Sequence, residues 1–173
     1  EGHLMSDPDR AAKVPEAMAA LVAAHEAVGG DVISGGGTGT WDSNTGITEL
    51  QAGSYTLMDT AYQALGVGFA KALALRTTAI SHGSRGEWAV VDGGLKALGM
   101  DHGDPTIDGA LVWYCADEHT VFSMADGAPL PAIGTRVRLW PAHVDPTVAY
   151  HEALWVHRGD EVVDRWEVDL RSW

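Results

Sequence analysis

The glycine-rich segment at residues 34–40 is the first part of the sequence whose residue types could bind a ligand. It reads SGGGTGT and follows Val32 and Ile33, two β-branched residues that favour a strand. Its glycines allow backbone N–H groups to approach a ligand closely, and Thr38 and Thr40 add hydroxyl groups. A strand that ends in such a loop can form a concave nest of amides, which suits an anion such as phosphate.

A second corner lies at residues 51–55, which read QAGSY. It places Gly53 and Ser54 at the end of another short run, so that two neighbouring strand ends could flank one phosphate. No lysine follows the glycines of the first corner, so the P-loop pattern is absent, and the dinucleotide-binding glycine pattern is absent as well. From the residues alone, a pair of ordinary glycine-rich turns is the alternative interpretation.

His143 and Asp145 form a candidate metal-binding pair after a predicted strand at residues 136–140. In an extended segment residues i and i+2 point the same way, so an imidazole nitrogen and a carboxylate oxygen could share one divalent ion. Water or substrate would fill the open positions of the ion. A surface turn without a metal is the alternative, because a lone His-x-Asp pattern is common by chance.

The elements expected to position the glycine-rich corners form an αβ unit. Residues 15–28 have apolar side chains at helical spacing, with Pro15 in the first turn and glycines after the end. Residues 31–34 and 48–52 are predicted strands, and residues 58–66 are a short helical or irregular exit. A helix followed by a strand and a loop is the repeat of a (β/α) barrel.

The pattern changes after residue 68, where short strands replace the αβ unit. Strand-like runs separated by turn residues follow at residues 69–80, 87–92, 111–115, 120–122, 135–139, 153–157 and 162–168. The last two flank a predicted four-residue turn at residues 158–161. Such a series favours an antiparallel β domain. The predicted division is therefore 1–68 for the α/β part and 69–173 for the β domain.

Composition and charge argue against several classes of protein. The formal net charge is −13, with 24 acidic and 11 basic residues, which disfavours binding to nucleic acid or to anionic lipid. No apolar run is long enough for a transmembrane helix, and no signal-peptide pattern is present. Cys115 is the only cysteine, so an internal disulfide is impossible. We therefore expect no nucleic acid and no membrane among the partners, and a cytoplasmic location.

Together with residues 49–59, which read ELQAGSYTLMD, the segment 34–40 resembles the family of D-threonine aldolases and D-serine dehydratases. These are pyridoxal-phosphate enzymes with the alanine-racemase type of barrel. The resemblance covers essentially the whole chain, and its most specific parts are the two corners and the His143/Asp145 pair. It implies an α/β part that forms the C-terminal units of a (β/α)8 barrel, followed by an antiparallel β domain with a metal site.

The resemblance also implies roles for individual residues. The residues at cofactor-binding positions are His3, Thr38, Gly39, Gly53, Ser54 and Tyr55. His3, at the end of a strand over residues 1–5, would lie beside the pyridine ring, and the others would hold the phosphate.

The same resemblance assigns a divalent metal to His143 and Asp145. Asp145 stands where the dehydratases typically have cysteine, which favours the aldolase branch and a hard ion such as manganese, with magnesium or zinc as alternatives. His102 and His119 are further candidates, either as groups near the metal or substrate or as ordinary turn residues.

The family needs a lysine that forms a Schiff base with pyridoxal phosphate on the first barrel strand. Lys13, Lys71 and Lys96 are the only lysines, and none occupies a corresponding position, so the catalytic residues are unknown from this sequence. We therefore expect the chain to be the C-terminal part of a longer enzyme that is inactive without the N-terminal half of the barrel. The resemblance also implies a homodimer.

The resulting hypothesis is a pyridoxal-phosphate- and metal-dependent lyase that cleaves a D-3-hydroxy amino acid into glycine and an aldehyde. One alternative is a dehydratase acting on D-serine or 3-hydroxyaspartate, and another is a racemase of the same fold, which would not need the metal pair. A third, of a different class, is a non-catalytic fragment or a β interaction module.

Overall fold

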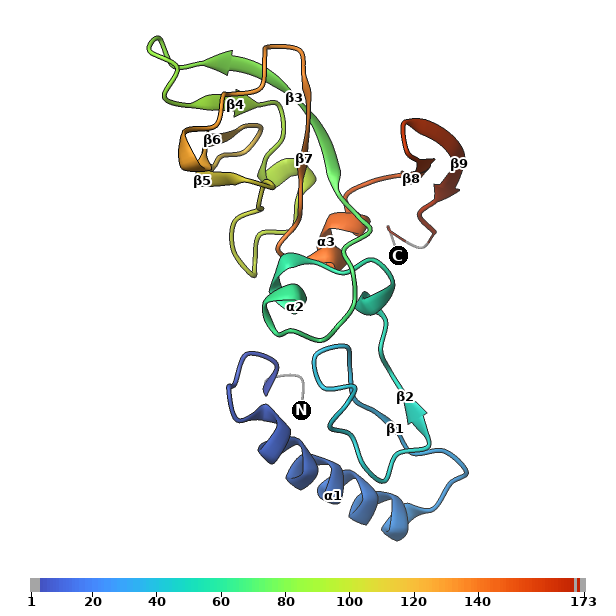
Figure 1. Cartoon of the computed structure of the whole chain (residues 1–173). Helices are drawn as coiled ribbons and strands as arrows, with labels where there is room; N and C mark the ends of the chain where they lie inside the picture. The colour runs from blue at the N-terminus through green and yellow to red at the C-terminus, as the bar shows by residue number, and fades with distance from the viewer. Residues whose placement is uncertain (1–3, 170, 172–173) are drawn as a thin grey trace. The chain divides into compact units, whose positions relative to one another are not determined.

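The computed structural model describes residues 4–169 and 171, and the chain divides into two compact units. The first comprises Glu1–Met58 and Tyr62–Ala70, and the second comprises Asp59–Ala61 and Lys71–Trp173 (Figure 1). The short helix α2 (Thr60–Ala64) is divided between them. Among the described residues, no helix has the length and apolar character needed to cross a membrane.

The longest helix of the first unit, α1 (Arg10–Val28), begins earlier than the predicted residue 15. The carbonyl of Asp7 accepts the N–H of Arg10 at 3.1 Å, which closes a turn before the helix. Pro15 consequently lies inside the helix and not in its first turn, which corrects the prediction. Val14 and Met18, one turn apart, are the buried residues of the helix.

Strands β1 (Ser34–Gly35) and β2 (Glu49–Leu50) pair in parallel in the first unit. The predicted second strand contains β2, whereas the first was placed too early, because residues 31–33 precede β1. The Ile33 carbonyl nevertheless accepts the N–H groups of Thr48 and Glu49 at 2.9 and 3.1 Å. Because the carboxyl ends of parallel strands meet at one edge, the two glycine-rich corners leave the pair at the same end.

The prediction of a strand end over residues 1–5 is wrong for Leu4 and Met5, the two residues of this segment that the structure describes. Leu4 lies in a 3₁₀ turn, and its carbonyl accepts the N–H of Asp7 at 2.9 Å. His3 lies outside the described residues.

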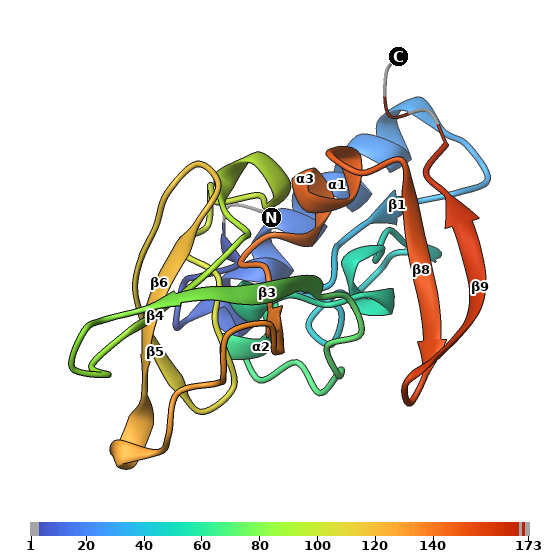
Figure 2. The same ribbon diagram turned by 90° about the horizontal axis from the view of Figure 1, so that it is seen from above.

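The second unit is built on a five-stranded antiparallel sheet with the strand order β5-β6-β4-β3-β7 (Figures 1 and 2). The strands are β3 (Leu75–His82), β4 (Ala89–Val91), β5 (Ala110–Cys115), β6 (Thr120–Met124) and β7 (Arg136–Leu139). Each overlaps a run predicted from the sequence, so the antiparallel β prediction is confirmed.

The core of this sheet also anchors the loop that reaches the candidate metal pair. Its buried members are Ala79, Ala89, Val91, Leu98, Ile107, Phe122 and Leu139. Leu98 is fully buried and directly follows the 3₁₀ turn η3 (Leu95–Ala97), so residues 99–102 leave the core from a fixed point.

Helix α3 (Val144–Ala149) follows β7, and the hairpin of β8 (Ala153–Arg158) and β9 (Glu161–Glu167) follows α3. Figures 1 and 2 show this hairpin apart from the five-stranded sheet. Its turn has two residues and not the predicted four, because Arg158 and Glu161 still pair across the strands. Gly159 has φ +60°, a conformation that suits a tight hairpin turn.

Candidate functional site

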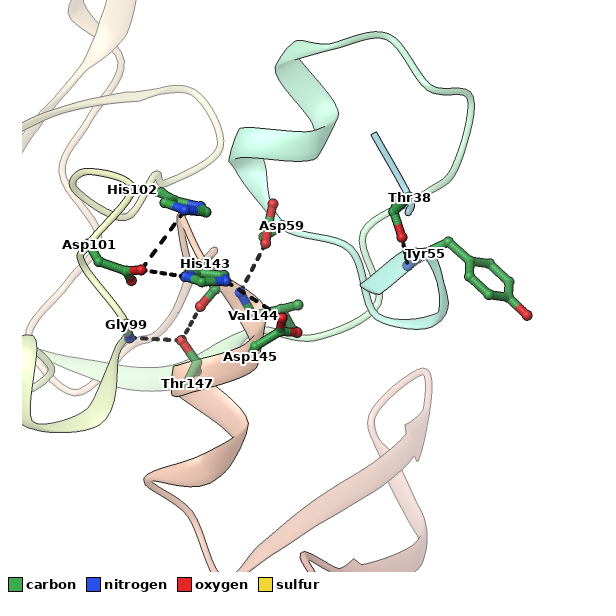
Figure 3. Close-up of polar contacts among 10 residues, drawn as sticks. All are labelled: Thr38, Tyr55, Asp59, Gly99, Asp101, His102, His143, Val144, Asp145 and Thr147. Carbon is green, nitrogen blue, oxygen red and sulfur yellow. Dashed lines mark hydrogen bonds and ion pairs between the residues drawn. The ribbon is translucent and has the colours of Figure 1, made fainter. Parts of the chain in front are cut away.

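His143 lies between β7 and α3, and its backbone is extended with φ −139° and ψ 117°. The extended conformation was predicted to continue through Asp145, but α3 begins at Val144, so Asp145 lies in the first helical turn. The two side chains still converge, since His143 Nε2 and Asp145 Oδ2 are 3.6 Å apart (Figure 3). The His143 side chain is 18% exposed and that of Asp145 is 66% exposed, so the pair faces solvent on one side.

The start of α3 is stabilised by a carboxylate that comes from far away in the sequence. The side chain of His143 makes no capping hydrogen bond. Instead, Asp59 Oδ2 accepts the N–H of Val144 at 2.9 Å, and Asp59 is fully buried. A carboxylate at this position satisfies one of the first-turn N–H groups that a helix leaves unpaired. It thereby fixes the backbone between His143 and Asp145.

Asp101 and His102 complete a polar cluster around His143 (Figure 3). Asp101 Oδ2 is 2.7 Å from His143 Nδ1, and His102 Nε2 is 3.9 Å from the same carboxylate oxygen. The rings of His102 and His143 stack with centroids 3.9 Å apart and planes inclined by 9°. The hydrogen bond with His143 holds the pKa of the Asp101 carboxyl below its ordinary value, although partial desolvation opposes the shift.

The structure thus adds Asp101 to the residues that sequence reasoning had selected. His102 had been considered near the metal or in a turn, and it lies in this cluster. His119 is exposed in the β5–β6 turn, where its carbonyl accepts the N–H of Ala116 at 2.7 Å. The interpretation of His119 as a turn residue therefore fits its position.

The glycine-rich corners of the first unit are joined by a hydrogen bond. The backbone N–H of Tyr55 donates to Thr38 Oγ1 at 3.1 Å, and Thr38 is 2% exposed. Gly53 precedes the 3₁₀ turn η2 (Ser54–Thr56), and a Cβ at Gly53 would meet no atom within 4 Å. The Tyr55 ring contacts Phe69 with centroids 5.3 Å apart, so it is the backbone of Tyr55 that joins the corners.

Two backbone N–H groups of the first corner have no acceptor among the described residues. Thr38 and Gly39 are buried, and within residues 4–169 and 171 no acceptor pairs with the backbone N–H of either residue. Buried N–H groups are nearly always satisfied in folded proteins, so two unpaired N–H groups at this corner fit an anion such as phosphate as their acceptor. Thr38, Gly39, Gly53, Ser54 and Tyr55 belong to the first unit, whereas the His143 cluster belongs to the second.

Each of the three lysines lies beside a carboxylate. Lys13 Nζ is 2.5 Å from Asp7 Oδ2, and Lys96 Nζ is 2.6 Å from Glu118 Oε1. Lys71 Nζ is 4.0 Å from a carboxylate oxygen and 4.4 Å from the centroid of the Trp140 ring. None of them lies in the glycine-rich corners or in the His143 cluster.

Comparison with known proteins gives the same family by sequence and by structure. A family model for a putative serine dehydratase domain matches residues 72–157. D-threonine aldolase of Arthrobacter sp. is 40% identical over 152 residues, covering 82% of this chain and 40% of that protein. The 3-hydroxy-D-aspartate aldolase of Paracoccus denitrificans strain Pd 1222 is 35% identical over 190 residues, covering 98% of this chain and 48% of that protein.

Solved structures show the same relationship. The chain is similar to D-threonine aldolase from Filomicrobium marinum, with a TM-score of 0.79 and 34% identity over 94% of this chain and 48% of the other. It is similar to D-threo-3-hydroxyaspartate dehydratase from Delftia sp. HT23, with a TM-score of 0.71 and 30% identity over 87% of this chain and 48% of the other. The chain spans less than half the length of these relatives.

An alanine-racemase-like protein from Idiomarina loihiensis matches with a TM-score of 0.73 and 26% identity, over 92% of this chain and 50% of that protein. The fold is therefore that of the C-terminal part of alanine-racemase-type pyridoxal-phosphate enzymes. Within that class, the chain belongs to the D-threonine aldolase and D-serine dehydratase-like family and corresponds to the C-terminal part of its members.

Proposed function

We propose that this chain is the metal-binding part of a pyridoxal-phosphate-dependent lyase that cleaves a D-3-hydroxy amino acid into glycine and an aldehyde. Two of its relatives are aldolases, named for D-threonine and for 3-hydroxy-D-aspartate. The single observation on which the proposal depends is the convergence of His143 Nε2 and Asp145 Oδ2, 3.6 Å apart at a solvent-facing position.

The separation of these two atoms fits a shared divalent ion. Metal bonds of about 2.1 Å to two adjacent ligand positions hold the ligand atoms roughly 3–3.5 Å apart. The donor set of one imidazole nitrogen and one carboxylate oxygen suits a hard or borderline ion, so we favour manganese, with magnesium or zinc as alternatives. Asp145 thereby supports the aldolase over a dehydratase with a thiolate at this position.

Thr38, Gly39, Gly53 and Ser54 would hold the phosphate of the cofactor, and the Tyr55 N–H would keep the two corners together. His3 stays a candidate for the pyridine ring. When bound, the cofactor supplies a sink for the electrons of the broken bond, and the metal lowers the pKa of the substrate 3-hydroxyl. The Schiff-base lysine would come from outside this chain, because none of its three lysines occupies the position that the family resemblance requires. The general base is left unassigned.

A dehydratase is the second candidate, because the Delftia dehydratase matches the chain with a TM-score of 0.71. The two reactions give different products from one substrate. Carbon–carbon cleavage of D-threonine gives glycine and acetaldehyde, whereas its dehydration and hydrolysis give 2-oxobutanoate and ammonia.

The decisive assay uses a chimera in which this chain replaces the matching C-terminal part of the Filomicrobium aldolase, which supplies the rest of the barrel. With pyridoxal phosphate and Mn²⁺, we expect acetaldehyde from D-threonine and loss of activity on addition of a chelator. His143→Ala should abolish turnover, and His119→Ala, a variant of the exposed turn histidine, should not. Formation of 2-oxobutanoate would select the dehydratase. A folded chimera that forms neither product would support a non-catalytic role.

A further inference from the structure

We propose that Asp101 is a positioning residue of the metal site: it holds His143 in the tautomer that presents Nε2, and it thereby sets how tightly a divalent ion binds. The inference rests on the proposed function, because it takes His143 as a metal ligand. It adds a residue that lies 42 positions away from His143 in the sequence.

The hydrogen bond between the two side chains determines where the imidazole proton lies. A carboxylate can only accept, so at 2.7 Å from Asp101 Oδ2 the His143 Nδ1 atom must be the donor. In the neutral ring the proton on Nδ1 leaves a lone pair on Nε2, which is the nitrogen 3.6 Å from Asp145 Oδ2. The metal-facing nitrogen is therefore ready to coordinate without moving a proton.

The loop that carries Asp101 is fixed to the helix that carries Asp145. The N–H of Gly99 donates to Thr147 Oγ1 at 2.9 Å, and the same hydroxyl donates to the His143 carbonyl at 2.7 Å. A Cβ at Gly99 would lie 2.2 Å from Pro146 Cγ, so only glycine allows this approach. Leu98, directly before Gly99, is fully buried and further anchors the loop.

His102 limits the His143 ring from one face. Its stacked ring, 3.9 Å away, would collide with rotation of the imidazole about χ2. Asp101 at Nδ1 and His102 against one face thus act on the same side chain, and Asp145 lies on the side of Nε2. Carboxylates that accept from the second nitrogen of a ligating histidine raise its basicity and orient it.

The test uses the 173-residue chain and compares wild type with Asp101→Ala, Asp101→Asn and Asp104→Ala. Asp104 lies in the same loop and forms no hydrogen bond or ion pair within the described residues, so its variant controls for the loss of one carboxylate. Long-range ¹H–¹⁵N spectra of the metal-free chain report the tautomer of His143, assigned with a His143→Gln variant. Titration with Mn²⁺, followed by the loss of its free EPR signal, reports affinity.

We expect the Nδ1–H tautomer in wild type and a shift toward Nε2–H in Asp101→Ala, with Mn²⁺ affinity weaker by about 10- to 100-fold. Asp101→Asn, which keeps an acceptor oxygen, should lie between the two, and Asp104→Ala should match wild type. An unchanged tautomer and unchanged affinity in Asp101→Ala would overturn the inference and leave the proposed function intact. If wild type itself binds no Mn²⁺, the manganese site of the proposed function fails instead, and the role of Asp101 in binding that ion fails with it.

Discussion

At the scale of single residues, Asp145 distinguishes the proposed metal site from one with a thiolate ligand. An oxygen ligand favours a hard ion, whereas a thiolate favours zinc. The His143 imidazole is compatible with either, so residue 145 should decide metal preference.

Asp145→Cys should therefore change the metal that the chain selects. We expect the ratio of Zn²⁺ to Mn²⁺ affinity to rise by about tenfold or more, which corresponds to ~1.4 kcal/mol. Competition titrations of the two ions against a chromophoric chelator measure this ratio. Asp145→Asn is the control, since it keeps an oxygen and removes the charge, and it should weaken both ions. A ratio that is the same in Asp145→Cys and wild type would show that residue 145 does not bind the ion.

The sequence correctly predicted that the side chains of His143 and Asp145 lie close together. The extended backbone assumed through Asp145 was wrong, because Asp145 lies in the first turn of α3. The two residues are close in sequence, so either an extended segment or a first helical turn can bring them together. Asp101 could not be selected in the same way, because its contact with His143 is tertiary and spans 42 residues. Its position depends on Leu98 entering the core and on Gly99 touching Pro146.

At the scale of elements, the close approach of residues 99–102 to α3 is the feature that shapes the candidate metal site. Gly99 forms an isolated bridge with His143, and its N–H is bonded to Thr147. The packing of loop against helix leaves no space for a side chain at this position.

Gly99→Ala should consequently destabilise the protein by about 1–3 kcal/mol, because the new methyl group would overlap Pro146 and one of the two segments must move. Urea unfolding measures the change in the free energy of unfolding. Gly53→Ala is the matched control: its φ is −116° and its Cβ would meet no atom within 4 Å, so we expect a change below about 0.5 kcal/mol. Equal stability of Gly99→Ala and wild type would contradict the packing described for the loop and α3.

The elements themselves were predictable to different degrees. The sheet strands could be found from short β-branched runs, since burial of one face selects that pattern. Helix α3 was missed because Pro146 follows Asp145, a pair that reads as a turn, although proline is also tolerated in a first helical turn. The start of α1 was missed because it depends on the turn closed by Asp7.

At the scale of the whole molecule, the chain divides into two units and spans less than half the length of the relatives that it matches. Several large apolar side chains of the β domain are exposed, namely Leu111, Trp113 and Tyr114 on β5 and Trp155, Val162 and Trp166 on the β8–β9 hairpin. Such exposed groups are consistent with a further surface that covers them. The N-terminal half of a barrel and a second copy of the chain stay our proposed partners.

Family and fold class could be predicted from the sequence because the two glycine-rich corners and the His143/Asp145 pair are specific as a set. The division into a cofactor-binding part over 1–68 and a metal-binding β domain over 69–173 stays a proposal. The function of the whole protein could not be predicted as firmly, because none of the three lysines occupies the position that the family resemblance requires and the sequence does not show which residue is the base.

The measurement that tests the central claim most directly is the binding of Mn²⁺ to the purified 173-residue chain, followed by EPR, for wild type, His143→Ala and His119→Ala. The metal site that we propose predicts one Mn²⁺ per chain in wild type and in His119→Ala, and loss of that binding in His143→Ala. Absence of Mn²⁺ binding in wild type, or equal binding after removal of His143, would contradict the assignment of manganese to His143 and Asp145.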